Sequence, residues 1–254
     1  MTNFKKTLLG VAAAMALAAP VANAGLINVG GVIWDPDAAT DFSSQSISMR
    51  QFINAATGEL TGFGIITAFN GTAQNVFCPG CELTFQFGGY LPIGGTLIPG
   101  VGQTVNYAGG WARVYVDDTP EVANPSDYLA LNNANTGDGL LFLDLAGNAS
   151  NGVTLLGTNN DDGLGNSSGL TGVGRFDVIG GLAANNFDTN TQPNGSDLRF
   201  STSLTFFHNE PSILDVSGTG NFRGNTIPEP ATLALLGIGL LGMGGLSARK
   251  RAKA

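Results

Sequence analysis

The stretch that decides the fold is Glu82-Leu83-Thr84-Phe85-Gln86-Phe87, in which polar and apolar side chains alternate at every position. A period of two puts the leucine and both phenylalanines on one face of an extended strand and the polar residues on the other. Residues 111–117 repeat the scheme, with Ala112, Val114 and Val116 on one face and Trp111, Arg113 and Tyr115 opposite. Half-buried strands of this kind are typical of antiparallel sheets.

Further segments show the same alternation between turns rich in Gly, Asn, Asp and Pro. They are 26–33, 46–53, 60–69, 140–145, 153–157, 172–180, 198–206 and 213–222. No long amphipathic helix is evident outside the two ends of the chain. Many short strands separated by turns predict an all-β fold, an antiparallel β-sandwich that is jelly-roll-like, filling residues 25–226.

A small internal pattern recurs three times, as Leu60-Thr-Gly-Phe-Gly64, Leu170-Thr-Gly-Val-Gly174 and Val216-Ser-Gly-Thr-Gly220. The separations fit no standard repeat class. Because the chain holds 38 glycines, chance or shared strand chemistry is the expected origin.

Charge is distributed unevenly along the 254 residues. All four lysines lie near the ends, whereas the body has five arginines against eighteen of the nineteen acidic residues. A surface of this sign repels phosphate backbones and argues against nucleic-acid binding. It suits divalent cations or solubility.

The first 24 residues have the three parts of a secretory signal peptide. Lys5 and Lys6 supply the positive region, and a short Leu/Ala/Val-rich stretch follows it up to Pro20. The small side chains of Ala22 and Ala24 suit the pocket of signal peptidase, so cleavage after Ala24 is predicted. An uncleaved anchor helix is the alternative.

The C-terminus combines a short motif, an apolar span and a basic end. Pro228-Glu229-Pro230 precedes the uncharged residues 231–248, and Arg249, Lys250 and Arg251 begin the basic end at 249–253. Eighteen uncharged residues are close to the lower limit for a transmembrane helix. The basic end is expected to stay in the cytoplasm, with the body on the far side of the membrane.

This tail, residues 227–254, resembles the PEP-CTERM sorting tail of Gram-negative bacteria. The resemblance implies recognition by an exosortase-type enzyme, removal or transfer of the tail, and delivery to the cell surface or the extracellular matrix. An unprocessed anchor would explain the span and the basic end, but it would not need Pro228-Glu229-Pro230.

The cysteines, Cys78 and Cys81, enclose Pro79-Gly80, a turn dipeptide that brings two thiols together. In an exported protein this spacing favours a structural disulfide. A redox site would be expected at the start of a helix, whereas a strand pattern follows here. Zinc would need two further ligands, and the one histidine, His208, cannot supply them.

Asp161 and Asp162 lie in a loop rich in Gly, Asn and Ser, which offers oxygen ligands to Ca²⁺. The loop lacks the ligand spacing and the distal Glu of an EF-hand, so a solvated loop is the default expectation and no cofactor is predicted. Asp188 and Asp197 could contribute only if the fold brought their loops close to this one.

Catalytic patterns are weak. Asp117-Asp118 offers two carboxylates for glycosidase chemistry, but with eighteen acids in the body some such pair is always present. The nucleophile elbow Gly-x-Ser-x-Gly is absent, and His208 is the only histidine base available. We therefore expect no catalytic residues.

Aromatic residues beside polar ones often bind sugars, although core packing is the commoner role. Trp111 and Tyr115, on the polar side of their strand, are the first candidates for glycan contact. The sequence thus predicts an exported structural or adhesive protein of exopolysaccharide, biofilm or floc. The alternatives are a secreted carbohydrate-active enzyme and a Ca²⁺-dependent, lectin-like module with the same tail.

Overall fold

The computed structural model describes residues 25–37, 42–43, 47–95, 100–122, 129–160, 169–210 and 213–227. Every described strand and helix belongs to the unit Leu26–Pro228. Both predicted end helices, including the apolar span at 231–248, lie outside the described residues. Within the described part, no helix has the length and apolar character needed to cross a membrane.

This unit is built almost entirely of strands. They are β1 (Ile27–Val29), β2 (Val32–Trp34), β3 (Phe42–Ser43), β4 (Ile47–Asn54), β5 (Leu60–Ile66), β6 (Ala68–Phe69), β7 (Thr72–Ala73), β8 (Glu82–Ile93), β9 (Thr104–Asp117), β10 (Leu140–Gly147), β11 (Leu155–Asn159), β12 (Leu170–Gly180), β13 (Leu198–Glu210) and β14 (Ile213–Gly224). The helices are short: α2 (Gln74–Phe77), α3 (Ala184–Phe187) and the 3₁₀ turn η1 (Pro193–Gly195). Nearly every strand expected from the alternation is present. Two differ: 26–33 is a hairpin because Gly30 and Gly31 turn the chain with φ of 59° and 90°, and 60–69 divides into β5 and β6, which belong to different sheets.

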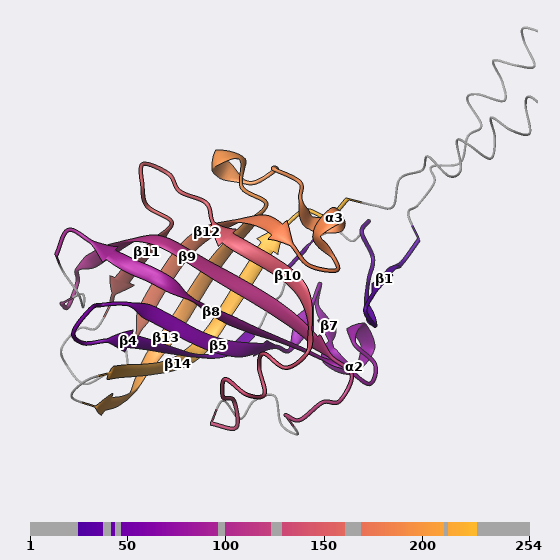
Figure 1. The fold of residues 1–254 in the computed structure, drawn as a ribbon, viewed down its shortest axis with the longest axis horizontal. Helices are drawn as coiled ribbons and strands as arrows, with labels where there is room; N and C mark the ends of the chain where they lie inside the picture. The colour runs from indigo at the N-terminus through magenta and orange to yellow at the C-terminus, as the bar shows by residue number, and fades with distance from the viewer. Residues whose placement is uncertain are drawn as a thin grey trace, which may run out of the picture. The chain divides into compact units, whose positions relative to one another are not determined.

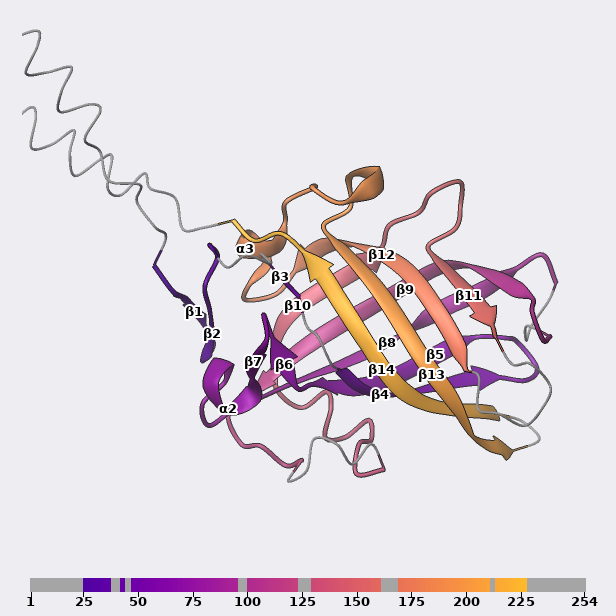
Figure 2. The same ribbon diagram turned by 180° about the vertical axis from the view of Figure 1, so that it is seen from behind.

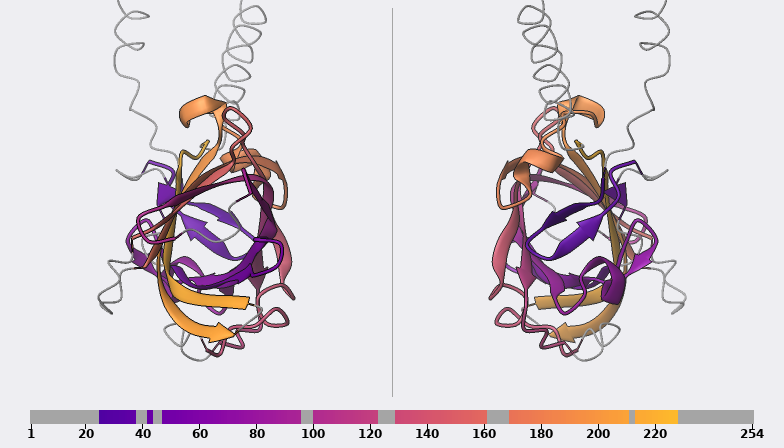
Figure 3. Two further views of the ribbon diagram at one scale, coloured as in Figure 1. Left: turned by 90° about the vertical axis from the view of Figure 1, so that its left-hand side faces the viewer. Right: turned by 90° about the vertical axis from the view of Figure 1, so that its right-hand side faces the viewer.

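The long strands form one antiparallel sheet that closes on itself (Figure 1). From β9 the order runs through β8, β5, β4, β14 and β13 to β12. Both β10 and β11 then pair with β12 on one side and with β9 on the other, which completes the circuit. Viewed end-on, the strands surround a common centre (Figure 3).

The predicted jelly-roll sandwich is therefore wrong, although the all-β antiparallel class is right. A sandwich needs two sheets packed face to face, whereas here the β12–β13 and β9–β10 pairings join all the long strands into one sheet. Alternation with a period of two is the same in both architectures, because each has one buried and one outer face. What allows closure is strand bending, as at Gly88–Gly89 in β8, opposite Gly109–Gly110 in β9, where three of the four glycines have positive φ.

The recurring Gly-x-Gly pattern marks inward-facing positions of β5, β12 and β14, where glycines make room for large side chains from neighbouring strands. Phe87 packs against Gly62 and Phe85 against Gly64, each pair directly opposite in register. A Cβ atom on either glycine would lie within 2.5 Å of the facing ring. At these positions the interior alternates bare backbone with aromatic rings, so rings from β8 fill the space that β5 leaves.

One end of the sheet is covered by small elements that carry aromatic residues. The β1–β2 hairpin, α2 and the β6–β7 hairpin gather there (Figure 2). Trp34 contacts Phe69, Phe142 and Phe187, with ring centroids 5.8, 6.3 and 5.5 Å apart. Because all four rings are almost fully buried, this end of the core is sealed.

A second, smaller core lies on the outer face of β5. Phe63 and Ile65 point outward there and are covered by Val122 and Leu131, which lie on the long connection between β9 and β10. The side chain of Thr84 donates to the carbonyl of Thr136 at 3.1 Å and fastens the same connection to β8. The connection therefore covers the outer face at Phe63, Ile65 and Thr84.

Candidate functional site

The best-exposed candidate from the sequence is the outer face of β9, where Trp111, Arg113 and Tyr115 all point away from the buried Ala112 and Val114. The guanidinium carbon of Arg113 lies 5.0 Å from the centroid of the Trp111 ring, and its Nε donates to Asp144 Oδ1 at 3.2 Å. An indole beside a guanidinium–carboxylate pair presents apolar surface, donors and acceptors together, which is what a sugar ring can use.

The position of Trp111 depends on the glycine bend in β8. Built Cβ atoms on Gly88 and Gly89 would lie 3.2 and 3.1 Å from the indole, so the ring rests directly against their backbone. Tyr115 is also half-buried and lies further along β9, opposite Thr84. Four residues of strand span roughly 13 Å, so the two aromatic residues would contact different units of one glycan chain.

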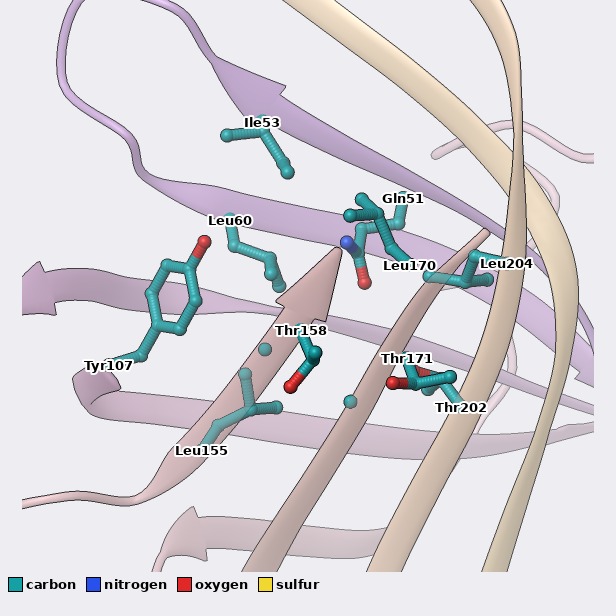
Figure 4. Close-up of a pocket in the computed structure, with 12 residues that line it drawn as sticks. Gln51, Ile53, Leu60, Tyr107, Leu155, Thr158, Leu170, Thr171, Thr202 and Leu204 are labelled. Carbon is teal, nitrogen blue, oxygen red and sulfur yellow. The ribbon is translucent and has the colours of Figure 1, made fainter. Parts of the chain in front are cut away.

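The interior of the closed sheet has a narrow cavity of about 20 Å³ between the inner faces of β4, β11, β12 and β13 (Figure 4). Its polar lining includes Gln51 and Thr202, and its apolar lining includes Leu60, Leu155 and Leu204. A deeper hollow of about 10 Å³ lies against Tyr90. Volumes of this size hold a single water molecule, so side chains fill the interior and no organic ligand fits there.

Two tyrosines face this interior. The Tyr90 hydroxyl is buried and has no hydrogen-bond partner among the described residues, and burial raises its pKa far above the ordinary value. Burial also raises the pKa of Tyr107 to about 12. Both phenols therefore stay neutral at physiological pH and do not act as bases there.

The sequence suggested Asp117 and Asp118 as a pair of carboxylates, but the structure pairs Asp117 with a different acid. Asp118 is exposed, and the acid beside Asp117 is Glu82, directly opposite in register on β8. Glu82 is fully buried, and its carboxylate accepts from the backbone N–H of Val122 at 3.3 Å. Burial raises the pKa of Glu82, and the charges of Asp117 and Asp138 add to that rise. The signal in the sequence that could have indicated this pair was Glu82, the acidic residue at the start of the 82–87 strand.

Cys78 and Cys81 are joined by a disulfide bond with their Cα atoms 5.1 Å apart, in agreement with the prediction. Both are buried, between α2 and the first residue of β8. A Cβ atom on Gly31 of the β1–β2 turn would lie 3.5 Å from Cys81 Sγ. The disulfide thus packs against the hairpin that covers one end of the sheet.

Asp161 and Asp162 lie outside the described residues. Asp197 is buried, and its carboxylate accepts from the backbone N–H groups of Val178, Thr189 and Asn190 at 2.6–2.7 Å. This carboxylate fastens the loop after α3 to β12, which occupies its oxygens. No group of metal-ligating side chains is found within the described ranges.

The processing residues also lie outside the described part: Ala22, Ala24, Pro228, Glu229, Pro230, Arg249, Lys250 and Arg251. The model of the PEP-CTERM protein-sorting motif matches residues 226–251. The chain therefore carries a PEP-CTERM sorting motif at its C-terminal tail, which implies export, transient membrane anchoring and sorting by an exosortase-type system in Gram-negative bacteria. No curated protein and no solved structure is significantly similar to the chain.

Proposed function

We propose that the protein is a non-catalytic component of the cell surface or extracellular matrix, with a structural or adhesive role in exopolysaccharide, biofilm or floc. The observation that carries this proposal is the PEP-CTERM motif at residues 226–251, which implies export and sorting by an exosortase-type system. The body would act without a cofactor, after signal peptidase and the exosortase have removed the two ends.

The body supports the proposal because its interior is filled and its contacts must be made from outside. The outer faces of β13 and β14 are rich in small polar side chains that suit sugar hydroxyls, namely Ser201, Ser203, Thr205 and Thr219. The Trp111 indole with the Arg113–Asp144 pair adds an aromatic contact on β9. We propose Trp111 and Tyr115 as glycan contacts.

The test is to express the full chain in its own cells and measure the share retained in the exopolysaccharide fraction. Trp111→Ala with Tyr115→Ala is expected to move protein into the culture supernatant. Ile93→Ala is a matched control, because that side chain is large, apolar and 44 % exposed but lies opposite Asn106, away from both aromatic residues along β9. If both variants, folded by circular dichroism, are retained like the wild type, the proposed glycan contact is wrong.

A further inference from the structure

Three of the body's five arginines stand side by side on the outer face of the sheet. Arg175 on β12 is directly opposite Arg199 on β13, which is directly opposite Arg223 on β14. The residues on either side of each arginine face inward, so the three arginines face outward. Arg199 and Arg223 are exposed, and Arg175 is half-buried. We call these three residues the arginine row. Since neighbouring strands are about 4.8 Å apart, the row spans about 10 Å.

The arginine row differs from the other two arginines because none of its members forms an ion pair with an acidic side chain of the described residues. Arg50 pairs with Asp215 and Arg113 with Asp144, and these are the ion pairs of the described residues. Like charges directly opposite one another on a sheet are destabilising. In a body with eighteen acids, three cations without an acid partner among the described residues therefore point to an external anion.

Acids do lie nearby, but they are engaged elsewhere. Asp177, two residues from Arg175 on the same outer face, accepts from Asn148 Nδ2 at 2.7 Å. Asp197, two residues before Arg199, is buried and accepts three backbone N–H groups. Neither makes an ion pair with the row in the described structure.

A surface hollow of about 290 Å³ adjoins the row at Arg175, where β10 gives way to β11 along β12. Its lining includes Ser150, Thr154, Leu156 and Val173. The Nε atom of Arg175 is buried and has no hydrogen-bond partner in the described structure. A hollow near the lower size limit of ligand pockets, with polar and apolar lining, suits one sugar ring.

We propose that the arginine row and this hollow bind an acidic polysaccharide, with carboxylates along the polymer on the guanidinium groups and a sugar ring in the hollow. Guanidinium groups bind carboxylates through two parallel hydrogen bonds. Two residues along these strands, Val173 and Ser201 lie side by side and offer apolar surface and a hydroxyl. A polymer with spaced charges suits three cations better than nucleic acid, whose dense charge the acidic body repels. The inference rests on the proposed matrix role and names the polymer class.

The test uses protein purified from its own cells and three polymers: polygalacturonate, carboxyl-reduced polygalacturonate and dextran. Arg199→Gln with Arg223→Gln is expected to weaken polygalacturonate binding at least tenfold at low salt. The slope of log affinity on log salt should become shallower by about 1.4, at about 0.7 for each lost contact. The control is Asn28→Asp with Asn75→Asp, which changes net charge by the same amount at exposed positions on the β1–β2 hairpin and α2, outside the row and the hollow.

The outcomes separate this inference from the proposal beneath it. Lost polygalacturonate binding in the arginine variant alone supports the arginine row. Equal loss in both double variants overturns it, because net charge would then be responsible. Unchanged binding in the arginine variant, with loss in Trp111→Ala/Tyr115→Ala, overturns the row but leaves the matrix role intact. Equal wild-type binding to polygalacturonate and its carboxyl-reduced form would overturn the acidic-polymer inference alone, whereas wild-type binding to none of the three polymers would overturn both.

Discussion

The glycines that face the interior should be intolerant of even one added methyl group, and Gly62→Ala is the sharpest case. A Cβ atom there would lie 2.3 Å from the carbonyl oxygen of Arg50 and 2.3 Å from Cζ of Phe87. Overpacking of this kind costs about 1–3 kcal/mol, and a backbone atom on one side puts the cost near the upper end. Replacing glycine in a strand restores about 0.5–1 kcal/mol, so we expect a net loss of about 2 kcal/mol.

The assay is equilibrium unfolding in guanidinium chloride, followed by circular dichroism. Gly180→Ala is the matched control, since the nearest atom to its added Cβ is 3.7 Å away, and it should be neutral or slightly stabilising. Shortening the facing ring with Phe87→Leu should relieve part of the clash, so the double variant should lose at least about 1 kcal/mol less than the two single losses combined. If Gly62→Ala is as stable as Gly180→Ala, the proposed packing of rings on glycines is wrong.

Three further predictions concern two buried carboxyl groups and the disulfide bond. Burial raises the pKa of Glu82, so ionisation of this carboxyl destabilises the fold as pH rises from the ordinary glutamate pKa through the raised one. Glu82→Gln should therefore have a higher melting temperature than the wild type at pH 7 but not at pH 3. An equal difference in melting temperature at both pH values would contradict this. Replacing Cys78 and Cys81 by serine removes the bond that closes a very short loop, and it should lower the free energy of unfolding by about 2 kcal/mol in a denaturant titration. No loss would indicate that the bond does not form in the cell. Asp197→Ala removes the acceptor of three N–H groups, of which that of Val178 is buried, and should cost about 2 kcal/mol. Amide exchange at residues 189–190 should become faster, and unchanged exchange would rule out the assigned role.

Much of the fold follows from alternation alone. The strand at 82–87 and the outward orientation of Trp111 are both visible in the sequence, because the side-chain period of a strand does not depend on its partners. Closure of the sheet does not follow from alternation, since it depends on which distant strands pair. The Gly-x-Gly pattern was a usable signal, because the inward glycines of β5 and Gly220 of β14 lie against phenylalanine rings and those of β12 lie against Thr202 and Leu155.

The candidate sites could likewise be predicted where their residues are close in sequence, but not where distant strands bring them together. Cys78 and Cys81 are close in sequence, and a turn dipeptide between them was enough to predict their bond. The pairing of Glu82 with Asp117 and the alignment of the arginine row join residues 24 or more positions apart. Register between such segments depends on turn lengths and bulges, which a pattern of residue types does not specify.

The central claim is that the tail directs export and processing of this chain, and intact mass spectrometry tests it most directly. Protein would be recovered from cells with a functional exosortase and from otherwise identical cells without one. With the enzyme, the mass should correspond to a chain that begins at Gly25 and lacks residues 231–254; without it, the mass should extend to Ala254. A chain that extends to Ala254 in both cells would contradict the claim.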